Sequence, residues 1–239
     1  MGTSSSYSAP TGGGWTRAKN LMSRFAAAGG PTSNASGGGL STSAVVGAYV
    51  GAHGGSKGAS SSAIAGRRVA QALGGFLADV AAKGFEQAVR DRGLEKLLGL
   101  DSEAALAGIV DFLAGPGNVA DEPVARAALI EVMEELWEEA AQNDVEKLTI
   151  DEKRLLDLLE RYMESYVFER LLRELGDRLK KGAITANESA RLEKQLREFI
   201  TETIKFEFKD IDPLKLDWNG MQGKEFIESL FQDAYSLIA

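Results

Sequence analysis

The sequence predicts an all-α protein, in which an acidic helical bundle is preceded by a flexible N-terminal segment rich in glycine and serine. Three observations lead to this prediction. Apolar residues recur at helical spacing through the second half of the chain, helix-capping residues and glycine stops divide that half into segments, and charge is unevenly distributed. No acidic residue precedes Asp79, so the first 78 residues carry about +6; because the net charge is −8, the rest carries about −14.

We divide the chain into a tail, residues 1–58, and an α-helical domain, residues 59–239. Glycine, serine and threonine dominate the tail, a composition typical of disordered and linker segments. One short helix is expected within it, from Thr16 to Ala28. The apolar residues 45–50 fit either a short strand or a buried helical turn, and periodicity does not decide between them.

A helical pattern begins near Ser60 and extends to about Arg92, and Gly74-Gly75 could interrupt it. Asp101 is a candidate N-cap for the next helix, which should end at Gly115.

Asp121 with Pro123 then starts a further helix. Thr149 with Glu152 forms a capping box before a long helix.

That long helix should end at Gly182, and Thr185 with Glu188 forms a second capping box. Residues 206–223 look irregular, and a final helix follows with apolar residues up to Leu237.

The composition excludes several classes of function. The chain has no cysteine, so it has no disulfides or thiol chemistry, which fits a cytoplasmic protein. The sequence start lacks the charged and apolar regions of a signal peptide, and residues 44–52, its most apolar stretch, are too short to cross a bilayer. The acidic body would repel phosphates, so we expect neither nucleic-acid nor membrane binding.

The only histidine, His53, lies in a glycine-rich stretch with no acidic residue within 25 positions. A catalytic triad or a metal cage needs a histidine held against carboxylates, so we interpret His53 as a loop residue. Residues 51–58 resemble a phosphate-binding loop, but Ser56 precedes Lys57 and Gly58 follows it, so the required Gly-Lys-Ser/Thr order is missing. An anion-binding glycine loop remains an alternative.

The other candidate site is a dense run of glutamates within residues 131–139. We interpret this run as a solvated helix face rather than as a site for a divalent metal. Trp137 and Trp218 are expected to be packing residues rather than a nucleotide-stacking platform. We therefore expect no bound metal or cofactor. The run consists of Glu131, Glu134, Glu135, Glu138 and Glu139.

The start of the chain carries the most distinctive chemistry. Met1 before the small Gly2 is the context in which the initiator methionine is removed, which frees the Gly2 amine. An α-amine has a pKa of about 8, so part of it is neutral and nucleophilic at neutral pH. Gly2 with Ser6 also fits the loose myristoylation pattern, but one acyl chain beside an acidic body would anchor poorly.

The chain begins with the run Met1-Gly2-Thr3-Ser4-Ser5-Ser6-Tyr7. This run is followed by a stretch that contains glycine, proline and tryptophan, and then by an acidic helical body. With these features, over roughly its first 70 residues, the chain resembles the QatB family of the bacterial Qat anti-phage system. The resemblance implies a protein substrate rather than an enzyme, whose N-terminal glycine is joined to a 7-deazaguanine by a QueC-like partner. The acceptor would be Gly2, and the partner would read Thr3, Ser4, Ser5 and Ser6.

The resemblance also implies an ATPase and a TatD-like nuclease as further components, and it assigns adenylation and any metal to the partner. Two alternatives come from other classes of function. The chain could be an unmodified structural or regulatory scaffold whose leader is only a linker, or an enzyme that uses the carboxylate run and a metal.

Overall fold

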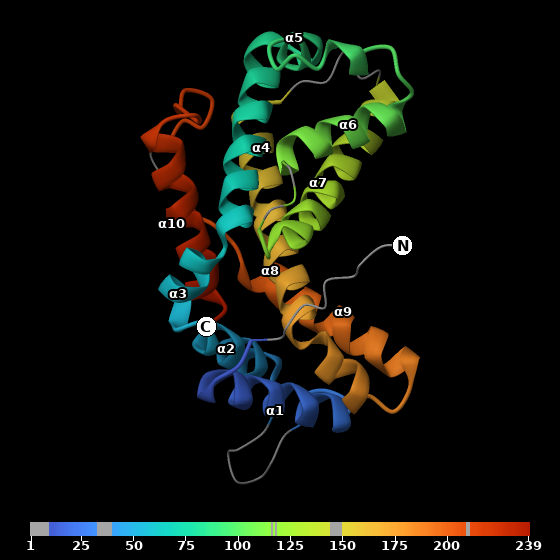
Figure 1. Ribbon diagram of the computed structural model, residues 1–239, viewed down its shortest axis with the longest axis vertical. Helices are drawn as coiled ribbons and strands as arrows, with labels where there is room; N and C mark the ends of the chain where they lie inside the picture. The colour runs from blue at the N-terminus through green and yellow to red at the C-terminus, as the bar shows by residue number, and fades with distance from the viewer. Residues whose placement is uncertain (1–9, 33–39, 116, 118, 144–149, 209–210) are drawn as a thin grey trace.

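Every regular element that the structure describes is helical, which confirms the predicted all-α fold (Figure 1). The computed structural model describes residues 10–32, 40–115, 117, 119–143, 150–208 and 211–239. The helices in chain order are α1 (Gly13–Ala27), α2 (Thr42–Ala52), α3 (Gly55–Ser62), α4 (Ile64–Lys83), α5 (Phe85–Arg90), the 3-10 turn η1 (Glu95–Leu97), α6 (Ser102–Ala114), α7 (Glu122–Asn143), α8 (Glu152–Gly182), α9 (Ala186–Thr203) and α10 (Met221–Leu237).

The longest helix, α8, lies in the middle of the molecule and contacts α1, α4, α7 and α9 (Figure 1). Its 31 residues span about 46 Å at the usual helical rise. The helix ends at Gly182, as predicted, but its N-cap is Asp151, whose side chain accepts a hydrogen bond from the Arg154 backbone N–H. The capping residue expected from the sequence, Thr149, lies outside the described residues.

The described residues at the front of the chain, 10–32 and 40–58, contain helices where a flexible tail with one short helix was expected. Helices α1, α2 and α3 pack on the body, with α1 against α8 and α3 against α10. Their buried side chains, among them Phe25, belong to the same hydrophobic core as those of the later helices. Small residues allow this packing: a Cβ on Gly14 would lie 3.0 Å from the Ala52 Cα, so α1 and α2 approach closely. The expected boundary at residue 58 falls inside α3.

The single helical run expected from residue 60 to residue 92 is instead divided into α3, α4 and α5, with breaks at Ala63 and Gly84. Gly84 has a φ of 82°, which favours glycine. The possible break at Gly74-Gly75 does not occur, because α4 continues through both residues. Both glycines are buried within α4, and a Cβ on Gly74 would overlap the Trp218 ring. These glycines therefore serve close packing rather than interruption.

Asp121 precedes α7 as predicted, but its carboxylate serves a different helix. It accepts hydrogen bonds from the backbone N–H groups of Ala65 at 2.9 Å and Gly66 at 3.2 Å, in the first turn of α4. The N-cap of α4 is Ala63, which has no side-chain acceptor, so Asp121 supplies one from a distance. The Tyr166 hydroxyl donates a third hydrogen bond at 2.8 Å, which joins α8 to this junction.

Other helix ends follow the local signals in the sequence. Asp101 caps α6 by accepting a hydrogen bond from the Ala104 N–H, and α6 ends before Gly115. Thr185 caps α9 in the same way through the Glu188 N–H, so these caps are confirmed. Both caps satisfy backbone donors within one turn of the capping residue.

Candidate functional site

The residues predicted to carry the function, Gly2 and Thr3 to Ser6, lie outside the described residues. The described chain starts at Pro10, whose carbonyl accepts a hydrogen bond from the Lys19 side chain at 2.6 Å. The first buried side chain after it is that of Trp15. The site that the structure offers is therefore the place where the N-terminal segment joins the helices.

Three aromatic rings from α1 and α2 meet at this place. Trp15 lies on α1, Tyr49 on α2, and His53 is the C-cap of α2. The His53 ring lies 4.8 Å from the Trp15 ring and 5.0 Å from the Tyr49 ring, in edge-to-face geometry. Such pairs stabilise beyond the burial of their area, by about 0.5–1.5 kcal/mol each. The trio fixes the base of the N-terminal segment on α2.

A hydrogen bond then connects this trio to α8. His53 Nε2 lies 2.8 Å from Glu174 Oε2, and both side chains are only 7% exposed. On its other side, Glu174 Oε1 lies 3.5 Å from Nε of Arg170, one helical turn earlier. Burial alone would raise the pKa of Glu174, but the hydrogen bond with His53 and the Arg170 charge outweigh it and lower the pKa below its ordinary value. Glu174 is therefore ionised at neutral pH.

Arg170 extends the cluster to α3 and α10. Its guanidinium donates to the Ala59 carbonyl at 3.1 Å, to the Tyr235 hydroxyl at 3.2 Å and to Ser62 Oγ at 2.9 Å. Burial raises the pKa of Tyr235, so its hydroxyl stays neutral and can accept this hydrogen bond. We call Trp15, Tyr49, His53, Arg170 and Glu174 the anchor cluster, because they hold α1, α2 and α3 on the body.

Ser62, His53 and Glu174 superficially match the composition of a hydrolase triad. Ser62 Oγ lies 3.4 Å from His53 Nδ1, while Glu174 contacts Nε2, the reverse of the usual assignment of ring nitrogens. The Ser62 hydroxyl donates to the Ala59 carbonyl at 3.0 Å and accepts from Arg170. Its proton is therefore directed away from the imidazole. The geometry fits a tie between helices rather than an activated nucleophile.

His53 lies in the turn after α2, which agrees with its interpretation as a loop residue, but tertiary packing brings the Glu174 carboxylate to it from 121 positions away. A signal for this arrangement exists on α8. The stripe that contains Tyr162 and Tyr166 continues at the same four-residue spacing to Arg170 and Glu174. Charged residues on the buried stripe of a helix require charged partners, and the only histidine was a candidate.

Residues 51–58 form the end of α2, a turn and the start of α3. A Cβ on Gly58 would overlap the backbone carbonyl of His53, so this glycine permits the tight turn between the two helices. The segment therefore does not have the strand-to-helix form of a phosphate-binding loop, which agrees with the missing Gly-Lys-Ser/Thr order.

Two members of the carboxylate run on α7, Glu131 and Glu135, take part in ion pairs. Glu131 accepts from two Arg197 nitrogens at 2.9 Å each and from the Ser165 hydroxyl, and Glu135 pairs with Arg154 at 3.2 Å. Within the described part of the chain, no group of three or more possible ligands could hold a metal ion. These contacts indicate a role in joining α7 to α8 and α9.

The two tryptophans singled out in the sequence pack against other aromatic rings, as predicted. Trp218 is 4% exposed and donates its indole N–H to the Pro213 carbonyl at 2.8 Å. Trp137 is half-buried, with its ring 6.0 Å from that of Phe85. Among the helices that the structure describes, none combines the length and the apolarity needed to cross a bilayer.

Comparison with protein families gives one match, to the family described as Qat anti-phage system associated protein QatB, over residues 54–238. No curated protein and no solved structure matches the chain. The match begins at the α2–α3 turn, so the helical body is recognised, whereas the sequence resemblance was clearest in the first 70 residues. The family description names no enzymatic activity. Because the match covers most of the chain, the protein belongs to the QatB family of the Qat anti-phage system.

Proposed function

We propose that this chain is a non-enzymatic component of the Qat system, which acts in the cytoplasm as a protein substrate and adaptor. Met1 is removed, and a QueC-like partner conjugates the Gly2 amine to a 7-deazaguanine. Thr3 to Ser6 are the residues that this partner reads. Membership of the QatB family supports the defence role, and the sequence at the start of the chain supports Gly2 as acceptor.

The chemistry requires only an amine from this chain. The partner activates the carboxylate of the deazaguanine as an acyl adenylate, using ATP. The neutral Gly2 amine attacks the acyl carbon, a C–N bond forms, the C–O bond to AMP breaks, and the amine loses a proton to a base or to solvent. A glycine acceptor suits a narrow active site because it has no side chain, and its α-amine has a pKa of about 8.

The anchor cluster supports the adaptor role. Trp15 and His53 attach the start of α1 to α8, so the N-terminal segment departs from a fixed place on the body. The chain from Gly2 to Pro10 can span at most about 28 Å when fully extended. An enzyme that takes Gly2 must therefore dock within that distance of Pro10. The body would thus determine which enzyme reaches the acceptor.

Intact-mass measurement tests the proposal. The chain is co-expressed with the other proteins of its system, including the QueC-like enzyme, the ATPase and the TatD-like nuclease. We expect the mass of the chain without Met1, increased by one deazaguanine acyl group. Gly2→Pro should abolish both this increase and protection from phage, whereas Ser8→Pro, the same change farther along the leader, should retain both. An unmodified wild-type chain in cells that resist phage would refute the proposal.

An unmodified scaffold is the second candidate, favoured by the buried contact of His53 with Glu174 and by the inter-helix ion pairs that make the body a rigid support. Deletion of residues 2–9 separates the two functions, because it leaves all described residues in place. If the deleted chain folds and still protects from phage, the scaffold is the correct function. If it folds and protection is lost, the modified terminus is supported.

A further inference from the structure

The C-terminal ends of α1 and α8 meet at one end of the molecule (Figure 1). A Cβ on Gly182, at the end of α8, would lie 2.7 Å from the Ala26 Cβ and 2.9 Å from the Ser23 carbonyl oxygen. The start of α9 packs on the same end, because Arg191 donates a hydrogen bond to the Gly29 carbonyl at 2.8 Å. Three helix ends are therefore joined there by close packing.

The turn between α8 and α9 presents an apolar side chain at this end. Ile184 is 81% exposed, and its backbone N–H donates to Glu188 Oε2 at 3.0 Å. Thr185 follows it as the N-cap of α9, so hydrogen bonds hold the turn on both sides of its centre. A single exposed apolar residue is common on protein surfaces, so its surroundings decide whether it serves a contact.

Cations without partners lie near this turn on both helices. Arg24 is in the last turn of α1. Lys180 and Lys181 are in the last turn of α8, shortly after Arg178. All four side chains are exposed, and none has a hydrogen bond or ion pair to a residue that the structure describes. We call these four cations together with Ile184 the basic end.

The basic end stays positive after the nearby negative groups are counted. The exposed carboxylate of Asp177 lies one turn before Lys181, and the C-termini of two helices add about one further negative charge. Glu188 pairs with Arg191 at 4.0 Å, so these two charges cancel. Four cations against about two negative charges leave a net charge of about +2. The undescribed segment after α1, residues 33–39, contains no charged residue and does not change this sign.

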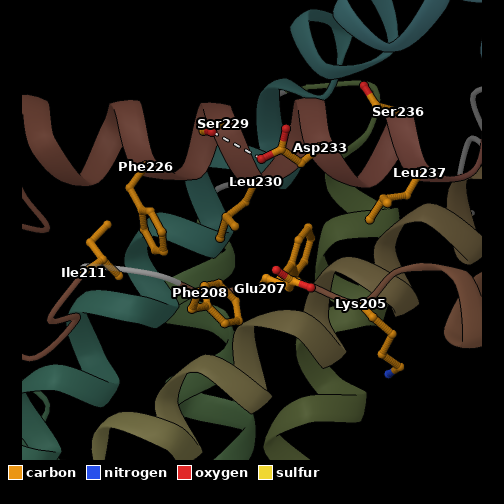
Figure 2. Close-up of a pocket in the computed structure, with 11 residues that line it drawn as sticks. Lys205, Glu207, Phe208, Ile211, Phe226, Ser229, Leu230, Asp233, Ser236 and Leu237 are labelled. Carbon is orange, nitrogen blue, oxygen red and sulfur yellow. Dashed lines mark hydrogen bonds between the residues drawn. The ribbon is translucent and has the colours of Figure 1, made fainter.

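Several cations of the body face carboxylates of the same chain instead. Figure 2 shows Lys205 at the edge of an open groove of about 630 Å³ between α10 and residues 205–208. Glu160 and Glu164 hold its ammonium group at 2.9 and 3.0 Å. Arg197 on α9 likewise contacts two carboxylates. The cations of the basic end differ because they remain available to carboxylates of another protein.

The basic end also lies within reach of an enzyme that acts on Gly2. Helix α1 starts three residues after Pro10, and its 15 residues span about 22 Å. The chain from Gly2 to Pro10 extends at most about 28 Å. An enzyme seated on the basic end needs to extend only about 22 Å toward Pro10 to take Gly2, which is less than the diameter of a small domain.

We propose that the basic end docks the enzyme that modifies Gly2, through carboxylates of that enzyme arranged around an apolar depression that takes Ile184. This inference rests on the proposed function, because it assigns the partner enzyme its docking surface. Complementary charges speed the association and hold the enzyme beside the leader. A nucleic acid is a poorer match, because the net charge of the basic end is small and the acidic body repels phosphates.

Biolayer interferometry with the purified full chain and the purified QueC-like enzyme of the same system measures the docking. We expect a double charge reversal, Arg178→Glu with Lys181→Glu, to weaken the affinity by at least about tenfold. Ile184→Glu should weaken it by a similar factor, because it places a charge in the apolar contact. Added salt should weaken the wild-type affinity more than that of the charge-reversed variant.

Two matched variants in the first turn of α10, which lies away from α1, control for general effects of charge and polarity (Figure 1). Lys224→Glu reverses an exposed cation, and Met221→Glu changes an apolar residue that is 67% exposed. Both should bind the enzyme as the wild type does. Thermal melts should give every variant the wild-type Tm, because all the changed side chains are exposed. Unchanged affinity of the variants in the basic end, or an equal loss in the controls, would overturn the docking surface.

The kinetics of conjugation, followed by intact mass, separate docking from chemistry. The charge-reversed variant should raise KM and leave kcat unchanged, because Gly2 and its leader are intact. A wild-type chain that binds the enzyme through the basic end but gains no mass would refute the Gly2 proposal and leave the docking surface supported. A modified chain whose KM does not respond to charge reversal would do the opposite.

Other occupants give different results in the same variants. Charge reversal could remove binding of a labelled single-stranded oligonucleotide, measured by anisotropy, or dissolve a wild-type dimer, detected by light scattering. Either result would assign the basic end to that occupant and overturn the proposal.

Discussion

The first two helices and the α7–α9 part of the body are held in place by different chemistry. Helices α1 and α2 attach through close packing of small residues, three aromatic rings and the hydrogen bond between His53 and Glu174, whose side chains are 7% exposed. Helices α7, α8 and α9 share several ion pairs that are partly exposed, such as those of Arg197 with Glu131 and Glu169. Exposed pairs contribute little singly, whereas breaking a buried pair is costly.

This difference indicates in which region the loss of a single interaction should reduce stability most. The body can lose one ion pair and keep the others, because Lys205 and Arg197 each contact two carboxylates. At the front, His53 and Arg170 both contact the same buried carboxylate, that of Glu174. The family match follows the same division, since it starts at residue 54 and includes the body but neither α1 nor α2. The attachment of the N-terminal segment is thus concentrated in the anchor cluster.

The largest loss of stability should come from removing the Glu174 carboxylate, which is buried against Arg170. We expect Glu174→Ala to lower the free energy of unfolding by about 3–5 kcal/mol, because Arg170 is then buried without its carboxylate. Denaturant titration measures this loss. Glu228→Ala is the matched control, because its pair with Arg67 leaves the carboxylate 43% exposed, and it should cost less than about 1 kcal/mol. Equal costs for the two variants would show that the front and the body are held alike.

Two glycine variants test the difference between a closely packed position in α4 and an open position in α2. We expect Gly74→Ala to destabilise the protein by about 1–3 kcal/mol, because the new Cβ would overlap the Trp218 ring within the core. Gly51→Ala, in α2, meets no atom within 4 Å and should instead stabilise by about 0.5–1 kcal/mol through higher helix propensity. Thermal melts of both variants check the opposite signs, and a neutral Gly74→Ala would contradict the observed Trp218 packing.

The smallest expected effect is a change in how stability declines at acidic pH, through the ion pair of Glu131 with Arg197. Burial alone would raise the pKa of Glu131, but hydrogen bonds from Arg197 and Ser165 outweigh it and lower the pKa below 4.5. A carboxylate with a lowered folded-state pKa stabilises above its unfolded pKa, and this contribution is lost as pH falls through the folded-state value. Glu131→Gln should cost up to about 1 kcal/mol at neutral pH and flatten the decline in stability below pH 4.5.

Urea titrations across that pH range measure the slope. Glu225→Gln, at an exposed position on α10, provides the control and should leave the slope unchanged. If Glu131→Gln shows the same acid-induced decline as the wild type, Arg197 does not stabilise the ionised form of Glu131 as the structure indicates.

The sequence by itself determined the helical class and those helix ends that depend on neighbouring residues. The caps at Asp101 and Thr185 are set by hydrogen bonds within about one turn. These interactions form among residues close in the chain, so their spacing is sufficient to predict them. The assignment of Gly2 as acceptor also comes from the sequence and stays a prediction.

Only the tertiary structure decided which distant groups meet. Asp121 carries a local capping signal, yet its carboxylate binds the first turn of α4, more than 50 positions away. The sequence around Gly74 allowed a break in the helix, but Trp218 packs over this glycine; His53 lies in a turn as expected, but its contact with Glu174 comes only from tertiary packing. Burial, close approach and ion pairing depend on how whole helices pack, and local spacing does not identify the distant partner of each residue.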